Sequence, residues 1–433
     1  MKKYTLVLFL LLLFSGLTIL NSVSAVELAK IDSTHQLFYV KKEFNTGLFA
    51  SGQNEREAQI SDNSEYSEEL YTGFASFKIS TQVWNFLHDK QETMKLMFNV
   101  GPFFGSGNVF DRSATEVINA NRQLYGLRAL LAGSYENRFY YDQKTYTLVQ
   151  VDGWVKNDVF WQNTTGTRVD SNLVMSDYDK DKFTDRLRYG FHAKAGWGFG
   201  RLNPVNNYMV ADYVLKYFYP RRVFSEAEEL HLARKIGEIK QRREPGIDRS
   251  SEAELHEMND FLRSEMMLEA TKLTEDEWLM GEFLPRYNGS RIEIGPYFNY
   301  YNREPDFYYG GFLTYRNDTY RNFNWNRNVS LQASYSHYKQ HDWANIMADL
   351  GWSYFPNLKT QIGFGLKYIP GVVIHSLENI EPVRHNFVPY IEYFTQINAR
   401  SRMNFSFAWR IADGEDFMKS GPEFSLSFYR SSY

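Results

Sequence analysis

The sequence has no cysteine among its 433 residues, which excludes a disulfide framework and a lipid-modified cysteine. Beyond residue 25 it also lacks any apolar run of roughly 18 residues, so a second membrane-spanning helix is excluded. The formal net charge of −4 gives no sign of a nucleic-acid partner. Motifs of the G-x-S-x-G, phosphate-loop and dinucleotide-binding kinds are absent. We therefore expect no nucleic acid and no cofactor.

The first 25 residues have the pattern of a secretory signal peptide. Lys2 and Lys3 form a positive start, an apolar run follows from Tyr4 to Leu20, and Val23-Ser24-Ala25 is a small-residue cleavage site. We expect a mature chain that begins at Val26; the alternative is an uncleaved membrane anchor. An exported chain of this size without disulfides is ordinary for a bacterial envelope.

What the chain has in abundance is aromatic residues, with 31 Tyr and 34 Phe, although its mean hydropathy is only −0.49. The stretch RMNFSFAWRI, residues 402–411, places large apolar groups on every second position. This alternation marks a strand with two different faces. A soluble sandwich would bury the apolar face, whereas a membrane barrel would turn it to lipid. In the second case the lipid-facing residues are Met403, Phe405, Phe407, Trp409 and Ile411.

Strand length decides between these alternatives. The alternating runs are about 9 to 12 residues long, the length that a tilted strand needs to cross a bilayer, whereas soluble strands average roughly 5 to 6. We predict strands at 37–50, 68–81, 93–105, 123–138, 145–161, 184–201, 290–301, 307–317, 328–338, 343–355, 359–369, 386–398, 402–412 and 422–430. The total of fourteen is even, as single-chain bacterial barrels require. Long polar loops are predicted after the first, third, fifth and eleventh strands, and short turns after the fourth, tenth and twelfth.

Residues 203–285 break this pattern, because their apolar period changes to about 3.6. Asn203-Pro204 resembles a helix start, and capping boxes begin at Ser225, Ser251 and Thr274. Leu273 and Trp278 are placed to form a hydrophobic staple across the third box. We predict an inserted domain of roughly four helices, on the periplasmic side because an even number of strands precedes it.

By these features the chain resembles a Gram-negative outer-membrane β-barrel protein over almost all of its mature length. The stretch Gly196-Trp197-Gly198-Phe199-Gly200-Arg201, which leads into the insert, is similar to uncharacterised barrels of the Bacteroidota type. The resemblance implies an outer-membrane location and no particular activity. One departure is the C-terminus, where Phe424, Leu426 and Phe428 are in phase with one another but Tyr433 is not. The barrel-insertion machinery would then have to recognise Phe428, or tolerate the additional residues Arg430-Ser431-Ser432-Tyr433.

Candidate metal and catalytic residues are few. Asp177-Tyr178-Asp179-Lys180-Asp181 has calcium-loop spacing, but Lys182 replaces the glycine and Arg188 the bidentate glutamate, so we interpret it as an outer loop. His337, His341 and Asp342 lack a fixed metal-binding geometry. We therefore predict no metal site, no catalytic residues and no enzyme activity; the alternative is a barrel hydrolase assembled from several strands.

The polar face of the strands carries more information, since charges behind a lipid-facing surface must pair or line water. Its cations outnumber the carboxylates Glu293, Asp349, Glu392 and Glu423. The cations are Lys78, Lys95, Arg128, Arg186, Arg188, Lys194, Lys367 and Arg410. The alternative to a water-filled lumen is a barrel whose outer loops fold in and pair with these groups.

These features predict an all-β transmembrane antiparallel β-barrel of about fourteen strands with an inserted α-helical periplasmic domain. Its parts are a signal peptide (1–25), barrel strands one to six (26–202), the insert (203–285) and strands seven to fourteen (286–433). The expected function is an outer-membrane channel for small solutes with anion preference. The alternative is an assembly or export component whose insert, residues 203–285, docks a periplasmic protein. Outer-membrane lipid and the insertion machinery are the other expected partners.

Overall fold

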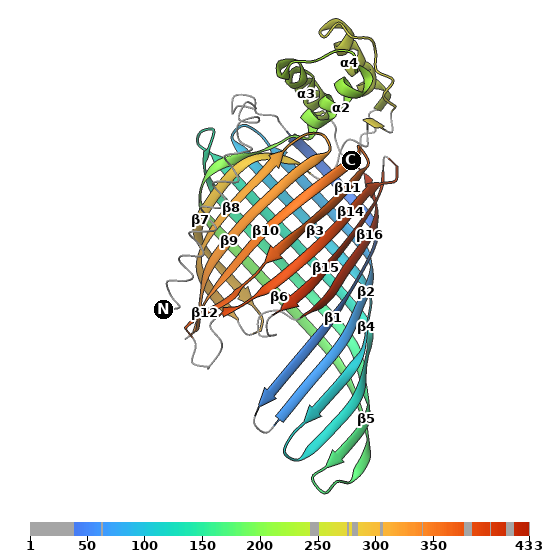
Figure 1. Ribbon diagram of the computed structural model, residues 1–433, viewed down its shortest axis with the longest axis vertical. Coiled ribbons are helices and arrows are strands. Elements are labelled where there is room, and N and C mark those ends of the chain that lie inside the picture. The colour runs from blue at the N-terminus through green and yellow to red at the C-terminus, as the bar shows by residue number, and fades with distance from the viewer. Residues whose placement is uncertain are drawn as a thin grey trace. The chain divides into compact units, whose positions relative to one another are not determined.

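The computed structural model describes residues 39–61, 64–242, 251–274, 277–278, 285–303, 306–339, 341–375, 383–398, 400–412 and 420–432. The predicted signal peptide and Tyr433 lie outside them. The described residues form one closed antiparallel β-barrel and a group of three helices (Figure 1). Each strand pairs with its neighbours in the chain, β16 pairs with β1, and the pairing of β10 with β11 completes the ring.

The strands fall into two groups by length. Six long strands come first: β1 Tyr39–Ser61, β2 Ser64–Phe86, β3 Lys90–Arg112, β4 Glu116–Tyr140, β5 Thr145–Asp170 and β6 Met175–Pro204. Shorter ones follow: β7 Tyr287–Tyr301, β8 Phe307–Tyr320, β9 Trp325–Tyr338, β10 His341–Asn357, β11 Thr360–Tyr368, β12 Gly371–His375, β13 Val383–Arg384, β14 Asn386–Gln396, β15 Ser401–Ala412 and β16 Gly421–Ser432.

The sixteen labelled segments make fourteen strands, because two strands are interrupted. β10 pairs first with β12 and then with β11, so these two segments are one strand broken at Ile369-Pro370. In the same way β13 and β14 together form the next strand, since β13 pairs with β12 and β14 with β11. The predicted number of strands is therefore confirmed.

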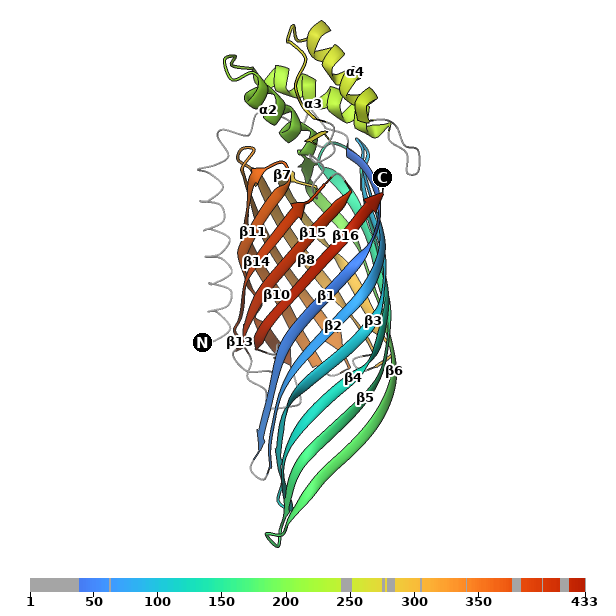
Figure 2. The ribbon, with the colours of Figure 1, turned by 90° about the vertical axis from the view of Figure 1, so that its right-hand side faces the viewer.

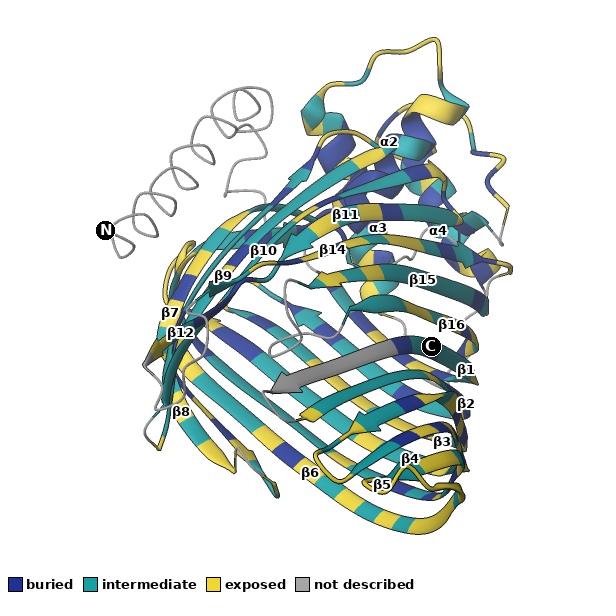
Figure 3. Ribbon diagram, turned by 60° about the horizontal axis from the view of Figure 1, so that its bottom comes forward, coloured by how far each residue is buried: buried dark blue, intermediate teal, exposed yellow. Residues whose placement is uncertain are grey.

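The two faces of the wall follow from the register. Successive side chains alternate between faces, and residues directly opposite each other in a ladder share a face. Contacts between strands that are not neighbours, such as Arg402 of β15 with Glu43 of β1 at 2.6 Å, identify the inner face. The outer face carries most of the exposed large apolar side chains, for example Leu127, Trp197 and Ile294. Figure 3 shows the resulting alternation of exposed and more buried residues along strands such as β6.

The predicted loops after the first, third and fifth strands are wrong, because these polar residues extend the strands. β1 to β6 are 23 to 30 residues long, whereas β7 to β10 have 14 to 17. They continue beyond the shorter strands at the end away from the helices (Figure 2). The register of β6 with β7 ends at Gly190, so the first part of β6 pairs with β5 alone.

A row of outward aromatic residues crosses the long strands where their outer face turns from apolar to polar. Phe104, Tyr125, Trp161 and Phe183 lie opposite one another on β3 to β6. The rings of Tyr125 and Trp161 stack at 5.9 Å, and those of Trp161 and Phe183 lie 5.0 Å apart. Beyond this row most of the outward residues are polar, such as Asn121, Asn163 and Asp181. Such a change is typical of the edge of a membrane-facing band.

Prolines interrupt the ladders at three seams of the wall. Strand pairing is interrupted at Pro102 between β2 and β3, at Pro296 between β6 and β7, and at Pro389 between β14 and β15. Proline has no backbone N–H to donate to a ladder. Next to the first break lies Gly101, where an added Cβ would stand 2.0 Å from the carbonyl oxygen of Ala75. Only glycine allows the two strands to approach so closely here.

The helices α2 Asn206–Phe218, α3 Glu226–Gln241 and α4 Ser251–Ser264 lie between β6 and β7. The capping box at Ser225 is confirmed: its side chain accepts a hydrogen bond from the N–H of Glu228, whose carboxylate accepts from the N–H of Ser225. The same pair of bonds joins Thr274 and Glu277. The prediction that Asn203-Pro204 begin a helix is wrong, because they end β6.

The helices share one apolar core, which includes Leu273 and Trp278 of the predicted staple. Three barrel residues at the helical end belong to the same core: Tyr320 of β8, Leu358 of the β10–β11 turn and Phe394 of β14. α3 also contacts β1. The helices are thus packed against several separate strands at one end of the barrel. None of the helices in the described part of the chain is long and apolar enough to span a membrane.

Candidate functional site

The inner wall of the barrel is where the predicted charged residues meet. In the register, Arg128 of β4 lies opposite Asp158 of β5, which lies opposite Arg186 of β6. Lys156 of β5 lies opposite Arg188 in the same way. Three of the eight predicted inward-facing cations, Arg128, Arg186 and Arg188, are therefore brought together around one carboxylate.

We call this group the Asp158 cluster: Asp158, Arg128, Lys156, Arg186 and Arg188. The Asp158 carboxylate accepts hydrogen bonds from Arg128 at 2.6 Å and from Arg188 at 2.5 Å. Lys156 and Arg186 each lie 3.6 Å from it. Asp158 itself is fully buried. Four cations thus surround one anion, so the cluster has a formal excess of three positive charges.

Two arginines of the cluster have N–H groups that donate no hydrogen bond to the described residues. The Nε atoms of Arg186 and Arg188 are buried and have no hydrogen-bond acceptor within the described ranges. The side chains of Arg186 and Arg188 are 32% and 28% exposed, so solvent reaches them from the inside of the barrel. A guanidinium group presents several donors in a planar fork that suits carboxylate and phosphate oxygens. Part of the hydrogen-bonding capacity of Arg186 and Arg188 is therefore unused within the described residues.

An aromatic group supports the cluster on the inner wall. The guanidinium carbon of Arg128 lies 4.1 Å from the ring centre of Phe103 and 5.4 Å from that of Phe74. Arg186 lies 5.7 Å from the ring centre of Phe160. Phe74, Phe103 and Phe160 are buried together with Leu124. Stacking on these rings fixes the arginines while leaving their donors free for oxygen atoms.

Nearer the helical end, a second inner network is almost balanced in charge. Glu293 of β7 accepts hydrogen bonds from Arg138 at 2.6 Å and from Tyr146 at 3.0 Å, and Arg291 lies 3.4 Å from it. Arg138 also pairs with Glu136. Glu293 and Arg138 are nearly inaccessible to solvent. This network links β4 to β7 and contributes little net electric field to the lumen.

The other predicted lumen residues are not part of the Asp158 cluster. Arg410 donates to the carbonyl oxygen of Asn54 at 3.0 Å, and the Lys367 ammonium lies 4.9 Å from the ring centre of Tyr390. Lys194 lies 5.0 Å from the ring centre of Phe312. Lys95 is on the inner face of β3 and is exposed. An exposed side chain on the inner face requires solvent space inside the barrel.

The insert packs against one end of the barrel, and Arg286 links the two. Its guanidinium lies 3.6 Å from the ring centre of Phe355 and donates to the carbonyl of Phe323 at 3.0 Å. Its backbone N–H donates to the side chain of Asn206 at 2.8 Å. Burial lowers the pKa of Arg286 to about 10, so it remains charged at neutral pH. The start of α2 is thereby fixed to the barrel end.

The residues considered for metal binding do not converge. Asp177 to Asp181 lie in β6 rather than in a loop, and the side chain of Asp181 accepts from Asn163 at 2.8 Å. The Nδ1 of His337 lies 2.7 Å from a carboxylate oxygen of Asp342, which also accepts from Tyr335. Across the described ranges, no three histidine or acidic residues are grouped in a way that could hold a metal ion.

Two central residues of the cluster, Asp158 and Lys156, were not among the sequence-based candidates. Strand five has a weak apolar pattern, so the sequence alone did not assign which of its residues face inward. The signal was nevertheless present, because Lys156, Asp158 and Phe160 alternate with Val155, Asn157 and Val159. A charged pair two residues apart within an alternating strand indicates the inner face of a barrel.

No family model matches the chain. No curated protein matches it either. Among solved structures it is similar to the toluene transporter TodX of P. putida, with 10% identity, a TM-score of 0.33 and coverage of 90% of this chain and 89% of that one. It is also similar to an outer membrane channel from Pseudomonas putida F1 (8% identity, TM-score 0.32, 92% and 97% covered). A third is the translocator domain of the autotransporter NalP from Neisseria meningitidis (7% identity, TM-score 0.31, 91% and 88% covered).

The chain's own residues define the class of protein. A closed antiparallel barrel leaves no unpaired sheet edge where its ring is complete, and its outer face is apolar while its inner face is charged. Backbone groups in a lipid phase must all be satisfied internally, which only helices and closed barrels achieve. The fold is therefore that of an outer-membrane type β-barrel of fourteen strands with a helical insert.

Proposed function

We propose that this protein is an outer-membrane channel that passes small anionic solutes along the β4–β6 side of its inner wall. The proposal is carried by one observation, the excess of three positive charges in the Asp158 cluster. A low-dielectric wall focuses the field of such charges into the lumen and raises the local concentration of anions. Lys78 and Lys95, on the inner faces of β2 and β3, add to this field.

Reversal potentials in planar bilayers test the proposal. In a gradient of potassium chloride at low salt, the purified protein should favour chloride over potassium. The preference should shrink in concentrated salt, because the Debye length falls from about 10 Å at 0.1 M to about 3 Å at 1 M. Replacing both Arg186 and Arg188 with glutamine should reduce the preference.

Two further variants sharpen this test. Asp158→Asn removes the only carboxylate of the cluster and should increase the anion preference, the opposite of the arginine variants. Arg430→Gln removes an exposed arginine on the outer face of β16 and should leave selectivity unchanged. A conducting pore that prefers cations, or one that ignores the cluster variants, would contradict the proposal. A protein without conductance would favour the second function below.

The second candidate function is an assembly or export component whose insert docks a periplasmic protein. Exposed apolar residues on the insert favour it: Val223 is 97% exposed and Met267 is 82% exposed. They lie near each other, since Arg222, next to Val223, donates to the carbonyl of Met266 at 3.3 Å. Deleting the insert would abolish export under this alternative, whereas in a passive channel it would leave or raise conductance.

The location follows from the same proposal. The apolar outer face would contact outer-membrane lipid, and the barrel-insertion machinery would place the chain there after cleavage of the signal peptide at residue 25. Both described ends of the barrel, Tyr39 and Ser432, lie at the end that carries the insert, which supports a periplasmic insert. The resemblance of residues 196–201 to Bacteroidota-type barrels remains a sequence-based expectation.

A further inference from the structure

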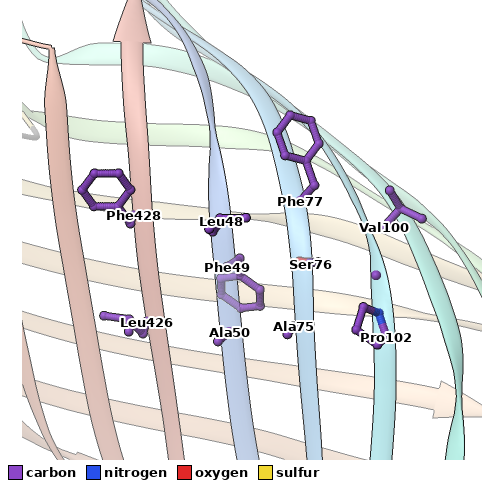
Figure 4. Close-up of a pocket in the computed structure, with 11 residues that line it drawn as sticks. Leu48, Phe49, Ala50, Ala75, Ser76, Phe77, Val100, Pro102, Leu426 and Phe428 are labelled. Carbon is purple, nitrogen blue, oxygen red and sulfur yellow. The ribbon is translucent and has the colours of Figure 1, made fainter.

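An apolar groove of about 510 Å³ lies on the outer face of the barrel, across β16, β1, β2 and β3 (Figure 4). Among the residues that form it, only Ser76 carries a polar side chain. Its sides consist of outward-facing apolar residues: Leu48, Phe77, Val100, Pro102, Leu426 and Phe428.

The groove exists because small residues form its floor. Ala50 and Ala75 lie directly opposite each other in the β1–β2 ladder, next to the opposite pair of larger side chains, Leu48 and Phe77. On the far side of Ala75 the β2–β3 ladder is interrupted at Gly101-Pro102. The outward residues next to this break, Val100 and Pro102, border the floor that the two alanines form. The hollow is thus built into the wall by the sequence of three strands.

One charged residue borders this groove. Arg430 of β16 has the same parity as Leu426 and Phe428 and therefore points outward, opposite Thr46 of β1. It is exposed and forms no hydrogen bond or ion pair within the described part of the chain. It follows Phe428 by two residues, about 7 Å along the strand, toward the end that carries the helices.

We propose that the groove and Arg430 bind one glycerophospholipid, with an acyl chain in the groove and the phosphate on the guanidinium of Arg430. This inference rests on the proposed membrane location, where acyl chains surround the outer face. Arginine is suited to phosphate, because its planar donors bond two oxygens at once. An arginine on the lipid face is tolerated near the headgroup level and is costly at the midplane. Arg430 lies opposite Ser401, one outward position beyond the apolar row of β15 that starts at Met403 opposite Phe428, as expected for the headgroup level.

The charge around the groove favours a phospholipid over a second copy of the barrel. The outward residues of β16, β1 and β2 near Arg430 include Thr46, Ile79 and Lys42, and none is acidic. A copy that presented the same face would bring arginine against arginine. A phosphate supplies the missing negative charge and carries its own apolar chain.

Native mass spectrometry of the full-length protein in detergent tests this site, with dipalmitoyl phosphatidylglycerol as the probe. The unmodified protein should retain one lipid at low lipid concentration. Ala50→Leu with Ala75→Leu fills the groove and should abolish retention. Arg430→Gln removes one charge-assisted contact and should weaken binding roughly tenfold. Dipalmitoyl glycerol has no phosphate and serves as a second probe. Its affinity for the unmodified protein should be no higher than the affinity of the Arg430 variant for the phospholipid.

Matched controls lie elsewhere on the barrel. Ala195→Leu enlarges an exposed outward alanine of β6, and Arg321→Gln neutralises an exposed arginine in the β8–β9 turn. Both should retain the lipid as the unmodified protein does. If the double alanine variant does not fold, as judged by heat-modifiable gel mobility, Ala75→Val alone should still reduce retention. If the groove variants and the control variants retained the lipid equally, the bound lipid would be nonspecific and the proposed site would be wrong. This outcome would leave the test of anion selectivity unaffected.

Discussion

An arginine in place of Phe407 is the most direct test of which face of β15 meets lipid. The predicted outward row runs from Met403 to Ile411, eight residues further on, and Phe407 is at its centre. At ~3.4 Å per residue this row is about 27 Å long, which corresponds to about 20 Å across the membrane at a strand tilt of about 40°. Because the apolar band of such barrels is about 25 Å tall, Phe407 lies near its middle. Arginine there should cost about 2–4 kcal/mol of folding free energy.

The neighbouring residue provides the matched control. Ser406 shares its face with Ser425, whose hydroxyl lies 2.7 Å from its own, and with Glu392 directly opposite on β14. Ser406→Arg loses one hydrogen bond, worth about 1 kcal/mol, and gains Glu392 as an ion-pair partner. Folding into lipid vesicles, titrated with guanidinium and read by gel mobility, should therefore show a difference of about 1–3 kcal/mol between the variants. Equal costs, or a larger cost at Ser406, would refute the assignment of faces.

Three further outcomes are expected. Arg402→Met leaves Glu43 buried beside Lys41 alone and should lower the free energy of unfolding by about 3–5 kcal/mol, whereas changing Glu43 to Gln as well should restore part of it. Because the chain has no native cysteine, Asn172→Cys in the β5–β6 turn should react with an impermeant thiol reagent on intact cells, while Glu252→Cys in α4 should not; the reverse pattern would place the insert outside. Hydrogen bonds from Lys235 and Arg242 lower the pKa of Glu257. The stabilisation that these bonds give to the packing of α3 on α4 is therefore complete above the ordinary carboxyl pKa of 4.5 and is lost as the pH falls through the lowered pKa. The protection of α4 amides against hydrogen exchange, expressed relative to intrinsic exchange at the same pH, should accordingly fall in acid, and Glu257→Gln should remove most of this dependence on pH.

The barrel could be predicted because its strands carry one physical signal. Within the membrane-facing part, apolar residues must alternate with polar ones, and RMNFSFAWRI does so without interruption. The predicted strand at 402–412 accordingly matches β15, which covers 401–412. The long strands were predicted too short for the same reason. Thr165 and Asp179 lie opposite each other in the β5–β6 ladder, yet both faces of this region are polar, so no alternation marks it.

The sequence predicted several of the charged residues of the site but not how they are grouped in space. Alternation along β6 assigns Arg186 and Arg188 to one face from sequence alone. That they converge on Asp158 depends on the register of β5 against β6, which is set by the turn at residues 171–174 and by pairing along the whole ladder. The attachment of the insert could not be predicted either, because Arg286 and Phe355 are 69 positions apart and meet only when β7 to β10 are paired.

The inner charges are distributed unevenly around the ring, and this unevenness is what a channel requires. The Glu293 network pairs its charges closely and excludes solvent, so it acts as a brace near the helical end. The buried Glu43 lies between Lys41 and Arg402, each at 2.6 Å, and links β1 to β15 in the same manner. The Asp158 cluster has too few carboxylates for its cations and remains accessible to solvent. A structural ion pair gains nothing from unmatched charge, which costs free energy through mutual repulsion. The unmatched and solvent-accessible cations of the Asp158 cluster are therefore better explained by a passing anion than by the stability of the barrel.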